Sequence, residues 1–115
     1  MGVFINNLKT FTSDITGEER EYKINNAIWV FMKSKFGLTQ KQWQDLIEEE
    51  ENLAGVKLVC SIMMANGLKV TEKEISENTD PLSINSFIIK YQTAMAERAL
   101  ELSPKDDDEE EDENF

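Results

Sequence analysis

A nearly continuous apolar run in the middle of the chain reads Val56-Lys57-Leu58-Val59-Cys60-Ser61-Ile62-Met63-Met64. Its main stripe has helical spacing, and Leu58 and Ile62 widen that stripe until the helix is apolar on nearly every side. A helix of this kind lies at the centre of a core. The run is preceded by Gly55, an expected break or close packing point, and followed by Asn66-Gly67, an expected left-handed cap. We therefore expect a helical domain built around this segment.

Two further helices are predicted before the apolar run. The first starts at the asparagine pair 25–26, which offers an N-cap, and ends at Gly37. The second opens with a capping box, in which the Thr39 hydroxyl serves the N3 amide and Gln42 reaches back. It runs into four consecutive glutamates, residues 48–51, which must lie on a solvated surface.

Two more helices are predicted after the run. Thr71 and Glu74 form a second capping box at the start of a short helix. Asp80 and Pro81 suit the N-cap and first position of the last helix, which continues to about Leu102. Its apolar stripe, at i, i+3, i+4 and i+7 spacing, comprises Ile84, Phe87, Ile88, Tyr91 and Met95.

The first 25 residues look extended. Residues 8–14 are rich in threonine and aromatic side chains, and residues 20–24 alternate charged with apolar side chains, with Gly17 between them where a turn needs positive φ. This pattern predicts a β-hairpin. The alternative is a short amphipathic helix that uses Phe4, Leu8 and Phe11.

Together these patterns predict a mainly α fold: about five helices with a short N-terminal β-hairpin. Residues 1–103 form a single domain, with the hairpin in residues 1–25 and the helices in residues 26–102. The side chains expected to share its core are Ile28, Phe31, Leu46, Val59, Ile62, Ile84, Ile88 and Tyr91.

The charge of the chain is uneven. Of its 23 acidic residues, eight lie in residues 106–113, so the remainder holds 15 acids against 12 bases. Contiguous like charges repel one another, and we predict that residues 104–115 form a disordered acidic tail. Its role stays open between a solubilising tail and a more specific one, which is either an electrostatic lure for a basic partner or a spacer that holds Phe115 away from the domain. Nucleic-acid binding is disfavoured because the bases form no patch.

Composition argues against most catalytic classes. The chain has no histidine, which excludes Ser-His and Cys-His catalysis and histidine zinc sites. Its acids lie in solvated runs or at caps, so no acid–base pair, metal site or cofactor site is assigned, and we expect no enzyme activity. The single cysteine, Cys60, lies on the apolar stripe and suits a buried thiol in a reducing compartment. Without an apolar run of the ~20 residues that span a bilayer, or the pattern of a signal peptide, we expect a cytoplasmic protein.

Three segments of the sequence occur in a suggestive order: residues 20–28 (REYKINNAI), residues 37–40 (GLTQ) and residues 71–75 (TEKEI). In this order they resemble the small tail assembly chaperones of long-tailed bacteriophages of Gram-positive hosts, over roughly residues 18–102. The resemblance implies a non-enzymatic protein that binds the long, helical tape-measure protein and keeps it soluble while tail-tube subunits polymerise around it. It further implies a location in the host cell cytoplasm and absence from the mature virion, and it transfers no site residue.

A chaperone of this kind needs an apolar surface for its client. The exposed parts of large apolar side chains are the candidates, although core packing is the default for both tryptophans. These candidate partner-binding residues are Trp29, Phe36, Trp43, Met63 and Met64. The tail tube protein is a second possible partner, and self-association is plausible because a long client offers repeated sites.

Two alternatives belong to other classes. One is an acidic regulator or DNA-mimic protein that binds a basic host protein, against which the near-balance of charge outside residues 106–113 argues. The other is a small hydrolase using carboxylates, which lacks a recognisable buried pair. Binding by a mimic should collapse as salt rises, whereas apolar client binding should survive.

Overall fold

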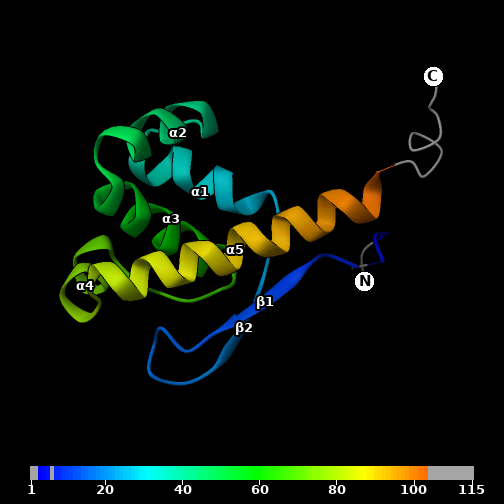
Figure 1. The fold of residues 1–115 in the computed structure, drawn as a ribbon, viewed down its shortest axis with the longest axis horizontal. Coiled ribbons are helices and arrows are strands. Elements are labelled where there is room, and N and C mark those ends of the chain that lie inside the picture. The colour runs from blue at the N-terminus through cyan, green and yellow to red at the C-terminus, as the bar shows by residue number, and fades with distance from the viewer. Residues whose placement is uncertain (1–2, 6, 104–115) are drawn as a thin grey trace.

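The computed structural model describes residues 3–5 and 7–103. Within these residues the chain forms an N-terminal hairpin followed by five helices (Figure 1). The elements are β1 (Thr10–Ser13), β2 (Arg20–Lys23), α1 (Ala27–Phe36), α2 (Gln40–Glu49), α3 (Glu51–Ala65), α4 (Glu72–Asn78) and α5 (Pro81–Leu102). The mainly helical fold with an N-terminal hairpin is thus confirmed. The predicted acidic tail, residues 104–115, lies outside the described residues.

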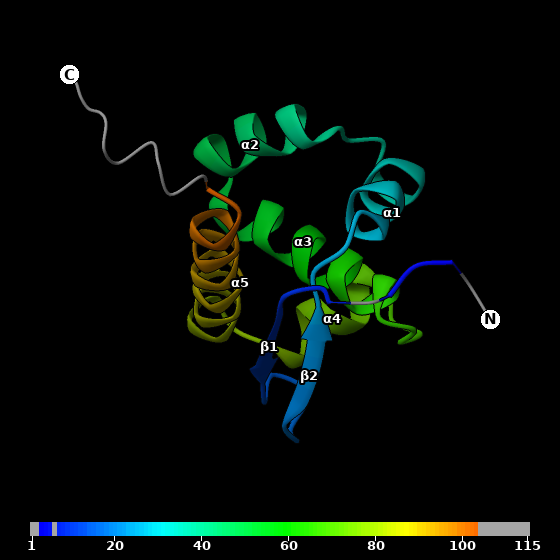
Figure 2. The same ribbon diagram turned by 90° about the vertical axis from the view of Figure 1, so that its right-hand side faces the viewer.

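Helix α3 is the centre of the fold. It packs against α1, α2, α4 and α5, which surround it in Figure 2. Its residues from Ala54 to Met63 are buried except for the half-buried Lys57. Both strands and all five described helices contribute to one hydrophobic cluster around it. The predicted central role of the apolar run is therefore confirmed.

The hairpin packs on α5. Its antiparallel strands pair Phe11 with Tyr22, and the Phe87 ring meets both of these rings edge-on with centroids 5.2 Å away. Gly17 takes a φ of 101° in the connecting turn, where its N–H donates to the Asp14 carbonyl at 2.9 Å. The alternative of a short helix in this region is wrong, because Phe11 lies in a strand and Phe4 is exposed.

Most predicted helix starts are confirmed at the level of single hydrogen bonds. The capping box of Thr39 with Gln42 is complete. Asp80 accepts from the Ser83 N–H at 2.8 Å directly before Pro81. At α4 the Thr71 hydroxyl accepts from the Glu74 N–H at 3.0 Å, and the structure shows no return bond from the Glu74 side chain. Asn26 precedes α1, but its side chain does not cap the helix.

The predicted core needs two corrections. Phe31 and Leu46 are only half-buried, because α1 turns Ile28 and Met32 inward and α2 turns Trp43 inward. Met95, expected on the buried stripe of α5, is exposed. In Figure 1 the C-terminal half of α5 runs past the other helices, so this part of its inner face has less to pack against. The other six predicted core residues are buried: Ile28, Val59, Ile62, Ile84, Ile88 and Tyr91.

Candidate functional site

Helix α5 carries a second stripe on the side opposite the core. It begins at Leu82 and repeats at alternating steps of four and three residues to Leu100. At about 100° of turn per residue, these positions fall on one narrow face. All six side chains are exposed and none is charged. We call this the outer stripe, and it comprises Leu82, Ser86, Ile89, Thr93, Ala96 and Leu100.

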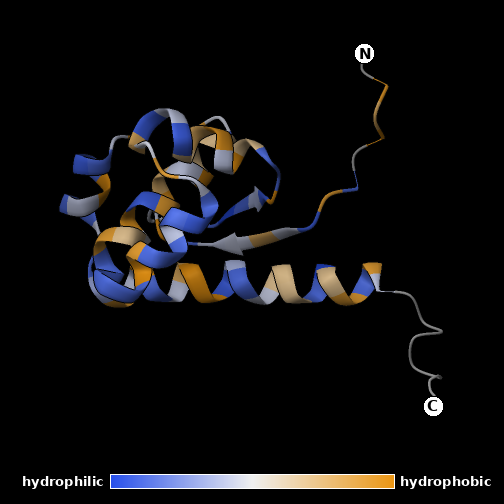
Figure 3. Cartoon of the chain, turned by 90° about the horizontal axis from the view of Figure 1, so that it is seen from above, coloured by the Kyte–Doolittle hydropathy of each residue, from blue (hydrophilic) through white to orange (hydrophobic). Residues whose placement is uncertain are grey.

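The position of α5 leaves the outer stripe uncovered. Figure 3 shows α5 along one edge of the molecule, and no other described element lies on its far side. Leu82 and Leu100, near the two ends of the stripe, are 80% and 76% exposed. Steps of four and three residues match the a and d positions of a coiled coil, where apolar side chains of one helix pack into another. The outer stripe thus has the geometry of a helix-binding seam.

Charged groups lie beside the outer stripe and not on it. Glu97 and Glu101 are held by Lys9, whose Nζ lies 3.2 Å from Glu97 Oε1 and 2.9 Å from Glu101 Oε2. The hydrogen bond from Lys9 lowers the pKa of Glu101, and the same contacts raise the pKa of Lys9. Lys9, Glu97 and Glu101 thus pair with one another beside the outer stripe. The side chains of the stripe itself are uncharged.

A hollow of about 310 Å³ widens the surface at the N-terminal end of the stripe. It lies between the first turns of α5 and the junction of α2 with α3, and Leu82 forms part of its wall. The main apolar walls come from Ile47, Leu82, Ile84 and Ile88. A partner helix lying on the outer stripe can therefore place a side chain in the hollow.

The structure places two of the predicted partner-binding residues in the core. Trp43 is 7% exposed and Met63 is 3% exposed, so neither offers a surface to a partner. The Trp43 Nε1 donates to the Ala54 carbonyl at 2.8 Å, and its ring meets the Trp29 ring edge-on at 5.7 Å between centroids. Trp43 therefore joins α2 to α3, and the expectation that it serves as a surface contact is corrected.

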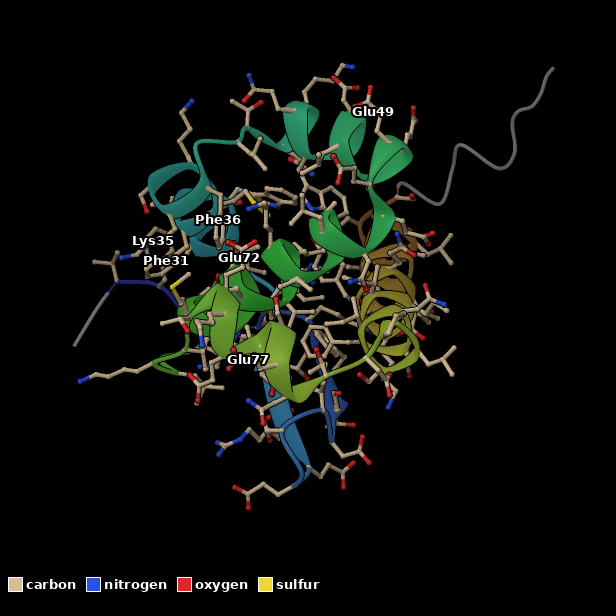
Figure 4. All side chains as sticks on the ribbon, turned by 90° about the vertical axis from the view of Figure 1, so that its left-hand side faces the viewer. Phe31, Lys35, Phe36, Glu49, Glu72 and Glu77 are labelled. Carbon is tan, nitrogen blue, oxygen red and sulfur yellow. The ribbon has the colours of Figure 1, made fainter. Side chains whose placement is uncertain are left out.

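The other three predicted residues are half-buried and lie away from the outer stripe. Trp29 and Phe36 are on α1, and Met64 is near the end of α3. The Lys57 ammonium lies 4.6 Å from the centre of the Phe36 ring and binds Glu72 at 2.9 Å. Phe36 and Glu72 lie close together in Figure 4. Phe36 is thus part of a contact between α1, α3 and α4, and its role as a partner contact stays a prediction.

Two further titratable groups, Asp80 and Cys60, belong to the fold and not to the outer stripe. Asp80 caps α5, and its bonds from Ser83 lower its pKa. Burial raises the pKa of Cys60 to about 11, which keeps the thiol protonated. Within residues 3–5 and 7–103, no group of three or more potential metal-ligating side chains lies together. Over the same residues, none of the helices combines the length and the apolarity that a bilayer crossing requires.

Sequence reasoning missed the outer stripe, although its signal is present. Only the stripe containing Ile84 and Tyr91 was assigned to the last helix, because it has more and larger apolar residues. A search for a second heptad on the opposite face finds Leu82, Ile89 and Ala96 seven residues apart. Ser86 and Thr93 interrupt the apolar residues of this second stripe, as is typical of a surface that is also exposed to water.

The chain was compared with protein-family models, curated proteins and solved structures, and none of them gives a match.

Proposed function

We propose that this protein is a non-enzymatic tail assembly chaperone of a long-tailed bacteriophage. It binds the tape-measure protein in the host cell cytoplasm, keeps it soluble while the tail tube assembles, and is absent from the mature virion. The resemblance of residues 18–102 to that family suggests the role. The one structural observation that carries the proposal is the outer stripe of α5, a neutral and uncovered seam with heptad spacing.

The outer stripe suits a helical client for geometric reasons. From residue 82 to residue 100 it extends over about 27 Å at the rise of an α-helix. A client helix with apolar residues at heptad spacing can lie along this length and bury its own apolar stripe. One such contact is short, so each copy of the chaperone would hold the client weakly. A long client with repeated stripes gains retention from several copies and releases them one by one.

The charge of the chain fits the same role. Its formal net charge of −11 would keep a complex with an apolar client dissolved. The outer stripe itself is uncharged, so client binding draws on apolar burial and not on ion pairs. Contact with the tail tube protein, at the moment when the client is transferred, belongs to the same proposal.

Co-expression tests the proposal. A tape-measure protein of a long-tailed bacteriophage of a Gram-positive host is expressed with and without this protein, and the soluble fraction of the client is scored. We expect soluble client and a complex on size exclusion only when both proteins are present. The complex should persist when the salt concentration is raised, because apolar burial is little screened.

Two results would contradict the proposal. Equal solubility of the client in both expressions, with no complex, would remove the chaperone function. A complex that forms with basic host proteins and dissolves as salt rises would instead favour the acidic regulator.

A further inference from the structure

The two outer edges of the hairpin differ. On β2 the Asn66 side chain covers the edge: its Oδ1 accepts from the Lys23 N–H at 2.7 Å, and its Nδ2 donates to the Lys23 carbonyl at 3.1 Å. Asn66 also donates to the Ile62 carbonyl at 2.8 Å, which fixes the amide to the end of α3. A side-chain amide thus occupies the place of a neighbouring strand, and protected edges of this kind do not pair further.

The outer edge of β1 carries no such cover. The Ile24 N–H donates to the Lys9 carbonyl at 2.9 Å, so the backbone groups of Lys9 point towards β2. By alternation along an antiparallel pair, the backbone groups of Thr10 and Thr12 then point away from β2. Within residues 3–5 and 7–103, no hydrogen bond reaches these outward groups. β1 therefore keeps an edge that can accept another strand.

A groove of about 300 Å³ runs beside this open edge. Thr10, Phe11 and Thr12 form its β1 side. Its α5 side is formed by Ile89, Lys90, Thr93, Ala94 and Glu97. Ile89 and Thr93 also belong to the outer stripe, and Ile89 is 51% exposed, so an apolar side chain laid along β1 would cover it. An arm docked here and a client helix on the outer stripe would compete for these two side chains. We call this the β1 groove.

The same chain carries a segment that fits such a groove. Val3, Phe4 and Ile5 are 91%, 91% and 93% exposed, and Figure 3 shows this arm projecting away from the helices. Valine, isoleucine and phenylalanine favour extended strands. Residues 2–8 contain no charged side chain, so the arm brings no repulsion to an acidic protein.

We propose that the β1 groove is the docking site for the arm of a second copy of this chain, which adds residues 3–5 to β1 as a further strand. The arm is followed in the chain by β1, the strand whose outer edge is open. Two copies related by a two-fold axis can therefore exchange arms, and each contact then occurs twice. Alternate side chains of the added strand face Ile89 and Ala94, and the others lie over the threonines. Asn66 blocks β2, so the sheet grows only on the β1 side.

Cross-linking between two variants of the full chain, each with one added cysteine, tests the proposal directly. F4C is mixed with T12C, one of the two carrying a tag that changes its mass, and treated with a short bismaleimide. The native Cys60 is buried and is expected to stay unreacted. We expect a cross-linked heterodimer of F4C with T12C. The control mixture of F4C with V30C, whose cysteine lies at an exposed site on α1, should give none.

A second measurement uses the oligomeric state. The triple variant V3S/F4S/I5S should sediment closer to the monomer mass than the parent does, whereas V30S should not differ from the parent. Absence of the F4C–T12C heterodimer, or equal yield with V30C, overturns the proposal. So does cross-linking within one chain of the double variant F4C/T12C, because the arm then folds onto its own groove. None of these measurements needs a client, so their outcome is independent of the chaperone function.

Discussion

Lys9 and Glu101 lie 92 positions apart in the sequence, yet the Lys9 Nζ donates to Glu101 Oε2 at 2.9 Å. This contact ties the segment before β1 to the last turn of α5, beyond the part of the helix that packs on α3. The end of the outer stripe therefore lies beside an exposed ion pair with the segment that leads into the hairpin.

We predict that K9A raises the pKa of Glu101 towards its ordinary value. The hydrogen bond from Lys9 is the largest cause of the lowered pKa, and Arg98 contributes less. The contact is present above the ordinary carboxyl pKa and is lost as pH falls through the lowered one. At the alkaline end it is lost as pH rises through the raised pKa of Lys9. Titration of the Glu101 carboxyl by NMR measures the change. R98A is the control, with a smaller shift, and an unchanged pKa in K9A would show that the contact does not form in solution.

Gly55 is predicted to tolerate no larger residue. A Cβ placed there would lie 2.7 Å from Cγ2 of Ile84, because α3 and α5 approach closely at this point. We expect G55A to lower the free energy of unfolding by about 1–3 kcal/mol, as overpacking of a core does. Urea denaturation checks the value, with N52A on the exposed side of α3 as control. I84L removes the Cγ2 methyl that obstructs a Cβ at residue 55. The free energy of unfolding of the double variant G55A/I84L should therefore fall by less than the sum of the falls in the two single variants.

Trp43 is predicted to act through stability and not through binding. W43F keeps an aromatic ring but removes the donor to the buried Ala54 carbonyl. Loss of this hydrogen bond costs about 0.5–1.5 kcal/mol, and the smaller ring packs less well between α2 and α3, so the midpoint of denaturation should fall. Q44A, at an exposed neighbouring position of α2, should not change it. If W43F unfolded like the parent but released the client, Trp43 would be a contact residue after all.

Cys60 is predicted to be unreactive in the folded protein. Burial is the main cause that raises its pKa to about 11, and the negative charge of Glu72 adds to it. At neutral pH almost no thiolate is present, and the thiol is shielded from solvent. Labelling with a thiol reagent should be slow in buffer and fast in denaturant. Rapid labelling of the native protein would contradict the buried position.

The features that sequence reasoning predicted well depend on neighbouring residues. The capping box of Thr39, the Asp80–Pro81 start and the turn at Gly17 are each set within a few positions. The central position of α3 was also predictable, because a helix with apolar residues on every side has no face to leave exposed.

Other features depend on partners that are distant in sequence. Trp43 has polar neighbours in sequence, and only the packing of α2 on α3 buries it. Met95 continues the buried stripe of α5 by spacing, but it is exposed because α5 extends beyond the elements that pack against it. Whether a stripe is core or surface follows from how far the neighbouring helices extend, which local spacing does not encode. For that reason local spacing does not reveal that Trp43 is buried while Leu82 of the outer stripe is exposed.

The measurement that tests the central proposal most directly compares two charge substitutions for client binding. L82K/L100K places lysines at both ends of the outer stripe, and V30K places one at an exposed apolar site on α1. All three positions are exposed, so both variants should melt like the parent. The affinity of each for the tape-measure protein that the proposed function requires is then measured by titration. We predict that L82K/L100K loses about tenfold or more in affinity, while V30K binds like the parent. Equal affinity of L82K/L100K and the parent, or a loss confined to V30K, would contradict this prediction.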